Sequence, residues 1–174
     1  MSCKIIWFTG LSGSGKTTLS DSFSKKLTKL NYKVKKIDGD TFRKKNKNLK
    51  KFTKKNITEN NISIINYIKR IKHNYQYVIV SVISPLIKTR LKAKKIFKKD
   101  YFEIYLKCSI KTLIKRDTKG LYNLAIKKKI KNLIGYNSKI IYEQSKYKKI
   151  TINTEINDLK KCIIIIQKKF FKNL

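Results

Sequence analysis

The sequence predicts a three-layer α/β sandwich, in which helices cover both faces of a five-stranded parallel β-sheet. Three observations lead to this fold class. Apolar runs of strand length alternate with stretches of helical periodicity along all 174 residues. No hairpin signal joins two strands, so the connections are right-handed crossovers. Residues 77–83 are almost continuously apolar, as expected of a strand buried on both faces. We expect one domain, residues 1–174, with no linker or internal repeat.

The elements follow one another in a regular order. The first strand enters the core by about Ile5, and Leu19, Phe23 and Leu27 recur at helical spacing in a helix over about 15–30. We expect the remaining strands at 33–37, 77–83, 101–106 and 150–153. The expected helices cover 58–72, the region around Arg90, 109–115, a basic stretch reaching 132, and 157–172. The lysine-rich residues 44–55 are predicted to form a mobile flap or loop over the site.

A phosphate-binding motif lies between the first strand and the first helix. Gly10, Gly15, Lys16 and Thr17 match the pattern G-x-x-x-x-G-K-[ST] in the strand–loop–helix context that this motif requires. Such a loop directs backbone N–H groups at phosphate oxygens, and the helix adds the positive end of its dipole. Lys16 would meet the β- and γ-phosphates and the Thr17 hydroxyl a Mg²⁺ ion. The other residues expected to touch the nucleotide are Ser12, Gly13, Ser14 and Thr18.

Charge dominates the composition. Lys and Arg number 44 against 10 Asp and Glu, which gives a net charge of +34. Almost all of these cations are lysines, spread over the whole chain beside abundant Ile and Asn. We interpret the excess as a compositional bias at tolerant surface positions and not as a specific nucleic-acid surface. A positive field still favours an anionic small substrate.

Cysteine usage and hydropathy bear on location. Cys3, Cys108 and Cys162 are far apart and form no C-x-x-C pair, so we expect buried thiols of a reducing compartment. The apolar run 162–166 is far too short to span a membrane, and no signal peptide is expected before the first strand. These features predict a cytoplasmic protein.

Polar residues gather where the predicted parallel strands end, which is where open α/β sheets bind their ligands. Asp38-Gly39-Asp40 with Arg43 follows the second strand, and Ser84-Pro85 follows the third. After the fourth strand, Arg116 and Lys119 lie close to Gly120 and suit a phosphate-closing lid over about 116–137. The plainer alternatives are an Asp-Gly turn with solvated charges and a solvated helix end.

Four motifs together resemble those of the adenylylsulfate (APS) kinase family. They are residues 7–18, the Asp38-Gly39-Asp40-x-x-Arg43 stretch, Ile83-Ser84-Pro85, and Lys119-Gly120-Leu121-Tyr122, in the same order and spacing. The resemblance covers nearly the whole chain. It implies a P-loop kinase fold, ATP and Mg²⁺ as cofactors, and a homodimer. The implied reaction is phosphorylation of the ribose 3′-hydroxyl of a 5′-modified nucleotide, adenylylsulfate in the family.

The resemblance also implies roles by position. Lys16 and Thr17 would hold ATP and Mg²⁺, and Asp40 would act as the base or orient the acceptor. Ser84 would touch the ribose or phosphate. Asp38 would support the metal or the loop, and Arg43 would bind the anionic 5′ group. Phe52 would stack on the acceptor base, with Asn60 close to that base. The other residues expected to contact the acceptor are Ile83, Lys119, Gly120, Leu121 and Leu133. Arg116 would close the lid over the bound ATP.

Two departures affect the acceptor half. Asn56-Ile57 stands where the family usually has Asp-Arg, and Leu133 stands where it has a lid phenylalanine. The first change removes a cation and the second one side of an aromatic clamp. A related acceptor such as cytidine 5′-diphosphoramidate, used in capsule modification, is therefore an alternative. An ATP-dependent nucleic-acid-binding module is a second alternative, resting on charge alone, and a small-sugar kinase would leave Phe52 and Asn60 without a role.

Overall fold

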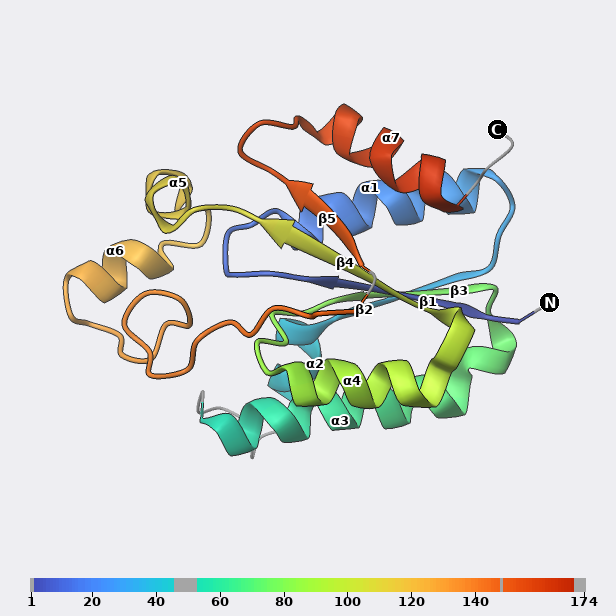
Figure 1. The fold of residues 1–174 in the computed structure, drawn as a ribbon, viewed down its shortest axis with the longest axis horizontal. Coiled ribbons are helices and arrows are strands. Elements are labelled where there is room, and N and C mark those ends of the chain that lie inside the picture. The colour runs from blue at the N-terminus through green and yellow to red at the C-terminus, as the bar shows by residue number, and fades with distance from the viewer. Residues whose placement is uncertain (1, 46–52, 148, 171–174) are drawn as a thin grey trace.

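A five-stranded parallel sheet in the order β2-β3-β1-β4-β5 lies between two layers of helices (Figure 1). The computed structural model describes residues 2–45, 53–147 and 149–170. The strands are β1 (Lys4–Thr9), β2 (Val34–Asp38), β3 (Tyr77–Ser81), β4 (Tyr101–Lys107) and β5 (Ile150–Asn153). The predicted fold class and the number and direction of the strands are confirmed.

Helices cover both faces of the sheet. Helices α1 (Lys16–Lys29) and α7 (Leu159–Phe170) lie on one face, and α2 (Gly39–Lys45), α3 (Lys54–Ile71) and α4 (Ile87–Phe97) on the other (Figure 1). Two short helices, α5 (Ile110–Arg116) and α6 (Leu121–Ile126), lie beyond the carboxyl ends of the strands. The 3₁₀ turns η2 (Lys72–Asn74) and η3 (Lys98–Asp100) precede β3 and β4. None of the described helices combines the length and apolarity that crossing a membrane requires.

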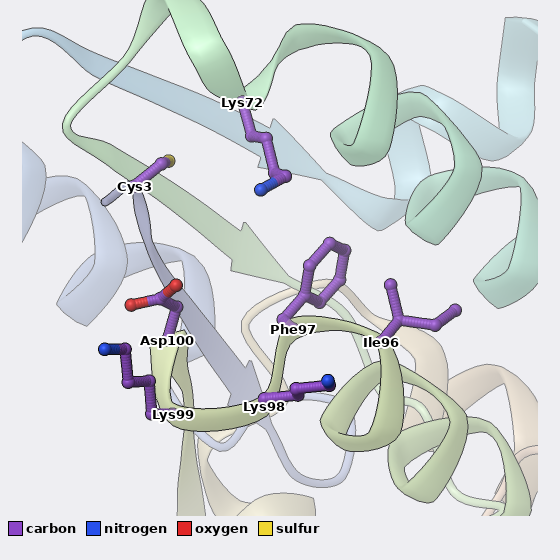
Figure 2. Close-up of a pocket in the computed structure, with 7 residues that line it drawn as sticks. All are labelled: Cys3, Lys72, Ile96, Phe97, Lys98, Lys99 and Asp100. Atoms are coloured by element: carbon purple, nitrogen blue, oxygen red, sulfur yellow. The ribbon is translucent and has the colours of Figure 1, made fainter. Parts of the chain in front are cut away.

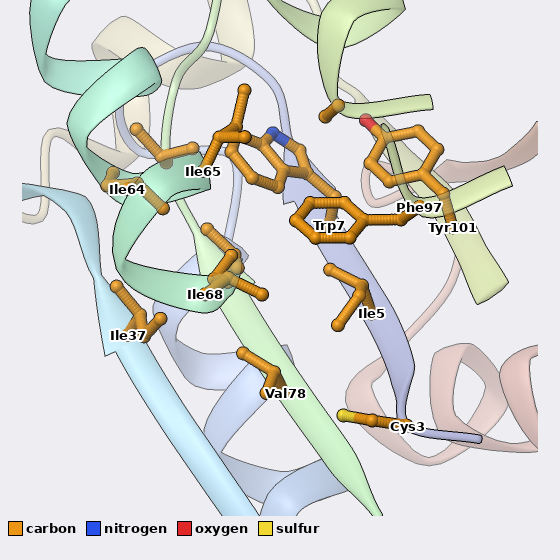
Figure 3. Close-up of a cluster of buried hydrophobic side chains, with 13 residues drawn as sticks. Cys3, Ile5, Trp7, Ile37, Ile64, Ile65, Ile68, Val78, Phe97 and Tyr101 are labelled. Carbon is orange, nitrogen blue, oxygen red and sulfur yellow. The ribbon is translucent and has the colours of Figure 1, made fainter. Parts of the chain in front are cut away.

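The core has two halves because side chains of a strand alternate between its faces. Ile5 and Trp7 of β1 pack under α3 and α4, whereas Ile6 and Phe8 pack under α1 and α7. Figure 3 shows the first half, where Trp7 lies beside Tyr101 with ring centroids 6.1 Å apart. All four β1 side chains are fully buried, which is why the strand reads as a continuous apolar run.

Side-chain caps set two helix starts that the apolar pattern did not predict. The Thr53 hydroxyl accepts a hydrogen bond from Asn56 N–H (3.1 Å), so α3 begins at Lys54 and not near 58. Asp38 Oδ1 accepts hydrogen bonds from the N–H groups of Asp40 (3.1 Å) and Thr41 (2.9 Å). That cap opens α2 where the sequence had indicated the end of a strand and a turn.

Two expectations about the extent of an element and one about burial were wrong. Helix α6 ends at Ile126, and Lys128 and Asn132 have φ of 57° and 65°, so no helix reaches 132. Strand β3 ends at Ser81. Cys108 is only partly buried, although Cys3 and Cys162 are buried thiols as expected. Of the predicted flap 44–55, the ends belong to α2 and α3, and residues 46–52 lie outside the described residues.

Candidate active site

The phosphate loop connects the end of β1 to the start of α1 at the carboxyl edge of the sheet. Gly10 has φ of 144°, and a Cβ there would lie 2.6 Å from the carbonyl oxygen of Leu106 in β4. Only glycine allows this close approach. Gly15, at φ of 88°, turns the chain into α1. The loop therefore has the backbone course of an anion cradle.

Lys16 lies inside this loop. Its Nζ donates a hydrogen bond to the Leu11 carbonyl oxygen (2.7 Å). Burial, together with the charge of the nearby Lys119, lowers the pKa of Lys16 to about 7, although Asp40 and Asp38 partly oppose this shift. An ammonium in such a position gains from an anion, because phosphate oxygens would replace its lost hydration.

Hydroxyl groups of the loop and of the first turn of α1 are suited to a phosphate ligand. Ser14 Oγ is buried and has no hydrogen-bond partner among the described residues. Thr17, in the first turn of α1, is exposed, and so is Thr18 beside it. A phosphate group in the loop would supply the acceptor that the Ser14 hydroxyl lacks.

Asp40 faces the loop from α2. Gly39 makes this possible, because a Cβ there would lie 2.5 Å from Val82 Cγ2, so α2 begins hard against the end of β3. Asp40 Oδ2 forms an ion pair with Lys119 Nζ at 2.6 Å. Partial desolvation raises the pKa of Asp40, but the hydrogen bond and charge of Lys119, with Lys16 and Arg43, outweigh it and hold that pKa below its usual value. The carboxylate is therefore ionised at neutral pH.

A cleft adjoins Asp40 on the α3 side. Its lining comes from α2, α3, the turn after β3 and the segment after α6, and includes Asp40, Arg43, Ile57, Asn61, Ile83, Ser84 and Ile134. Burial lowers the pKa of Arg43, although Asp40 raises it. The cleft thus joins a carboxylate and a guanidinium to an apolar wall.

Two adjacent amides of α3 are buried here. Asn60 is fully buried, and neither its Oδ1 nor its Nδ2 has a hydrogen-bond partner in the described part of the chain. Asn61 is 1% exposed, and its Oδ1 likewise has none there. Buried amides are costly when unpaired, so Asn61, which lines the cleft, indicates a polar ligand there. Asn60, beside it in α3, is not among the cleft-lining residues.

Ser84 occupies a constrained turn. Its φ is 44°, its side chain is buried, and its Oγ lies 3.3 Å from Thr89 Oγ1 in α4. A positive φ at a non-glycine residue needs support from its surroundings. Ser84 and its neighbours Ile83 and Pro85 line the cleft.

The predicted lid residues occupy three different environments. Lys119 reaches Asp40, as described above. Arg116 donates hydrogen bonds to the carbonyl oxygen (2.5 Å) and Oγ1 (3.3 Å) of Thr154, after β5. Gly120 has φ of 66° at the start of α6, and Leu121 is the first residue of that helix.

The segment after α6 packs on the phosphate loop. Tyr122 of α6 donates a hydrogen bond to the Ser12 carbonyl oxygen (3.0 Å). Leu133 packs against Tyr122 in a small apolar cluster, and its neighbour Ile134 reaches the cleft. A Cβ on Gly135 would lie 2.7 Å from the Leu11 side chain.

Sequence reasoning missed part of the cleft. Asn61 and Ile134 line it without having been singled out, although Asn61 lies on the inward face of α3 at helical spacing from Ile57 and Ile64. That spacing was visible in the sequence. Phe52, expected to stack on a base, lies outside the described residues.

A second, larger cavity of about 450 Å³ lies at the opposite, amino-terminal edge of the sheet (Figure 2). Its lining includes Cys3, Lys72, Phe97 and Asp100. Burial raises the pKa of the Cys3 thiol to about 11, so the thiol is not nucleophilic at neutral pH. The phosphate loop and its neighbours, at the other edge, are the candidate active site.

Comparison with known proteins points to one family. The family model described as adenylylsulphate kinase matches residues 2–153. A probable adenylyl-sulfate kinase of Archaeoglobus fulgidus is 36% identical over 154 residues, which are 88% of this chain and 97% of that protein. The adenylyl-sulfate kinase of Clostridium acetobutylicum is 36% identical over 159 residues, 91% of this chain and 78% of that protein.

Solved structures of related fold include an APS kinase. The APS kinase of Mycobacterium tuberculosis in complex with AMPPNP and APS superimposes with a TM-score of 0.88 at 26% identity, covering 97% of this chain and 98% of that one. A gluconokinase of Sinorhizobium meliloti has a TM-score of 0.66 at 14% identity, covering 98% of both chains, a likeness of fold alone.

Proposed function

This chain belongs to the adenylylsulfate kinase family and is an ATP-dependent phosphotransferase with an alcohol acceptor, and we propose that it phosphorylates the ribose 3′-hydroxyl of adenylylsulfate. One observation carries the assignment of roles: Asp40 stands between the phosphate loop and the cleft, near Lys16 and 2.6 Å from Lys119. Donor and acceptor would meet at this carboxylate.

The donor half rests on the phosphate loop. Lys16 would exchange its bond to the Leu11 carbonyl for the β- and γ-phosphates and neutralise charge that develops during transfer. The backbone from Gly10 to Gly15 and the Ser14 hydroxyl would hold the remaining phosphate oxygens. Arg116, which donates a hydrogen bond to the Thr154 carbonyl oxygen, would contact the bound ATP from the lid.

Thr17 is suited to hold Mg²⁺. Thr17 is an exposed residue in the first turn of α1, directly after Lys16. When bound, the ion would offset negative charge on the transferred phosphates.

Asp40 would orient the acceptor hydroxyl. Its lowered pKa makes it a weak base, yet a carboxylate oxygen accepts a hydrogen bond well when ionised. Phosphoryl transfer through a loose transition state depends on in-line positioning more than on early proton removal. Asp38 supports this geometry as the cap of α2.

The acceptor half would lie in the cleft. Arg43 and Asn61 line the cleft; Arg43 suits an anionic 5′ group, and the Asn61 amide suits the polar edge of a base or sugar. Asn60, fully buried beside Asn61 in α3, would add a polar contact close to the base. Ile57 places an apolar side chain in the same wall. This apolar side chain, in place of the arginine usual in the family, keeps cytidine 5′-diphosphoramidate as the competing acceptor.

The test is a transfer assay with ATP, Mg²⁺ and each acceptor in turn, with the phosphorylated product measured directly. We expect adenylylsulfate to be phosphorylated. Lys16→Ala and Asp40→Ala should each lower the rate at least about 100-fold, the scale of losing charge stabilisation or a positioned carboxylate. Lys115→Ala, an exposed lysine, is the control and should behave as wild type.

Three results would contradict parts of this assignment. Transfer to cytidine 5′-diphosphoramidate alone would replace the acceptor, and transfer to neither would remove the proposed activity. Near-wild-type turnover of Asp40→Ala would remove that residue from the reaction.

The wider expectations remain part of the proposal. We propose a single kinase domain whose residues 116–137 act as a lid, working as a cytoplasmic homodimer. Light scattering would then give twice the 20.5 kDa chain mass. The free cysteines among the described residues suit a reducing compartment.

A further inference from the structure

Residues 142–147 form an extended strap that leads from the lid back toward β5 without helix or strand. Loops normally carry solvated side chains. Here Ser145 is 3% exposed, and Tyr142, Glu143 and Tyr147 are partly buried. The strap is therefore built into the protein, beside the turn that borders the cleft.

Tyr142 connects the strap to the end of β1. Its hydroxyl lies 2.9 Å from Thr9 Oγ1, and the Thr9 hydroxyl donates to the Ile83 carbonyl oxygen. Because Thr9 has a single hydroxyl proton, Tyr142 must be the donor to Thr9. Burial strongly raises the pKa of Tyr142, which keeps that proton in place. The chain of bonds runs Tyr142 to Thr9 to Ile83.

These bonds join the two halves of the site. Thr9 immediately precedes Gly10, the first residue of the phosphate loop, and Ile83 lines the acceptor cleft. Tyr142 is not among the cleft-lining residues.

Arg90 fixes the strap from the other side. It is fully buried, it ion-pairs with Glu103 (Nε to Oε2, 3.3 Å), and its guanidinium lies 4.9 Å from the Tyr142 ring centroid. It donates to the carbonyl oxygens of Ser84 and Glu143. The same side chain thus holds the strap and the Ser84 backbone, whose φ is positive.

Backbone groups add to this attachment. The Glu143 N–H donates to the Pro85 carbonyl oxygen (2.9 Å), and Glu143 Oε2 accepts from the Ile87 N–H (2.7 Å) at the start of α4. The strap is therefore bonded to the turn after β3 and to the start of α4.

We propose that Tyr142 is a positioning residue for phosphoryl transfer. Through Thr9 it sets the separation between the phosphate loop and the turn after β3, and Arg90 holds its ring. This inference rests on the proposed function. In-line transfer is steeply sensitive to the distance between the reacting groups, so a small error in that separation affects turnover more than binding.

The test compares Tyr142→Phe with Tyr105→Phe. The Tyr105 ring stacks on Tyr142 with centroids 5.0 Å apart, and its hydroxyl makes no hydrogen bond within the described residues. Both variants lose one hydroxyl, but only the first loses the bond to Thr9. We expect Tyr142→Phe to lower kcat at least about ten-fold, with the KM for ATP and the KM for the acceptor nearly unchanged. Tyr105→Phe should match wild type. Equal kcat values in the two variants would overturn the proposal.

A double variant tests the route. If Tyr142 acts through Thr9, Thr9→Val with Tyr142→Phe should have the kcat of Thr9→Val alone. Losses that multiply would show that the two hydroxyls act separately, against the proposal.

Amide exchange decides the proposal even if the acceptor is wrong. The Val82 N–H bonds to the Phe8 carbonyl (3.1 Å) beside this junction, so Tyr142→Phe should speed exchange at Val82 and Glu143, and Tyr105→Phe should not. Unchanged exchange would reject the positioning role. Failure of wild type on both acceptors would instead reject the proposed function.

Discussion

Lys16 shows how a single residue in the free protein is prepared for its ligand. It forms no ion pair within the described residues, and burial lowers its pKa to about 7. The free protein therefore loses part of this charge near neutral pH, and a bound polyphosphate would restore it, because neighbouring negative charge favours the protonated form. Binding and protonation are linked.

This linkage predicts proton uptake on nucleotide binding. Above pH 7 free Lys16 is largely neutral, and the phosphates raise its pKa, so at pH 8 binding should take up close to one proton. Affinity should consequently fall as pH rises from 7 to 9. Calorimetry in two buffers of different ionisation enthalpy measures the uptake. Lys16→Met should take up none, and an equal uptake in that variant would assign the proton to another group.

The positions of residues in the fold were predictable where backbone spacing dictates them. The motif from Gly10 to Thr17 placed Lys16 correctly in a loop at the carboxyl edge, because glycine positions fix the course of the chain. The cleft was less accessible to sequence reasoning. Asn61 became visible as a lining residue only once α3 was positioned against the turn after β3.

At the level of elements, one ion pair joins α2 to the segment between α5 and α6. Lys119 and Asp40 have half-exposed side chains (48% and 55%), so the pair adds little stability. Its effect on Asp40 is chemical, because Lys119 is the strongest influence holding the pKa of that carboxyl low against desolvation.

Lys119→Ala should therefore shift the acid limb of the rate. Without Lys119, desolvation is less opposed and the pKa of Asp40 rises, so activity that needs ionised Asp40 is lost at a higher pH as the solution is acidified. The ratio of kcat at pH 4.5 to kcat at pH 7 should be lower than in wild type, with the melting temperature within about 4 °C. Lys115→Ala is the matched control. A pH profile that matches wild type would show that the pair is broken during turnover.

The elements themselves were largely predictable, and the exceptions have a common cause. The central strands β1, β3 and β4 are mostly buried and appear as apolar runs. The edge strands β2 and β5 are only partly buried and were found from shorter apolar stretches. Helix α2 was missed because it depends on the Asp38 cap, and the helix expected up to 132 fails at Lys128, whose φ of 57° ends it. Local side-chain bonds and single backbone angles outweigh apolar periodicity in such short segments.

At the scale of the whole molecule, the net charge of +34 creates a field that acts on every anion. Such a field does not discriminate sequences, because phosphate contacts carry no base information. It favours the encounter with nucleotides and also with nucleic acids. Specificity has to come from the loop and cleft, where Lys16, Asp40 and Arg43 are arranged.

The charge therefore predicts nucleic-acid binding whose affinity falls steeply as the salt concentration rises and does not depend on the nucleotide sequence. Affinity for an oligonucleotide should fall by about 10³ or more between 50 and 200 mM salt if several lysines contact phosphates, since binding is driven by counterion release. Fluorescence anisotropy with two oligonucleotides of equal length and different sequence measures this, with transfer activity followed in the same buffers. The two sequences should bind equally at each salt concentration. Selective binding that persists at physiological salt would instead indicate a true nucleic-acid site, since base contacts, unlike phosphate contacts, discriminate sequence.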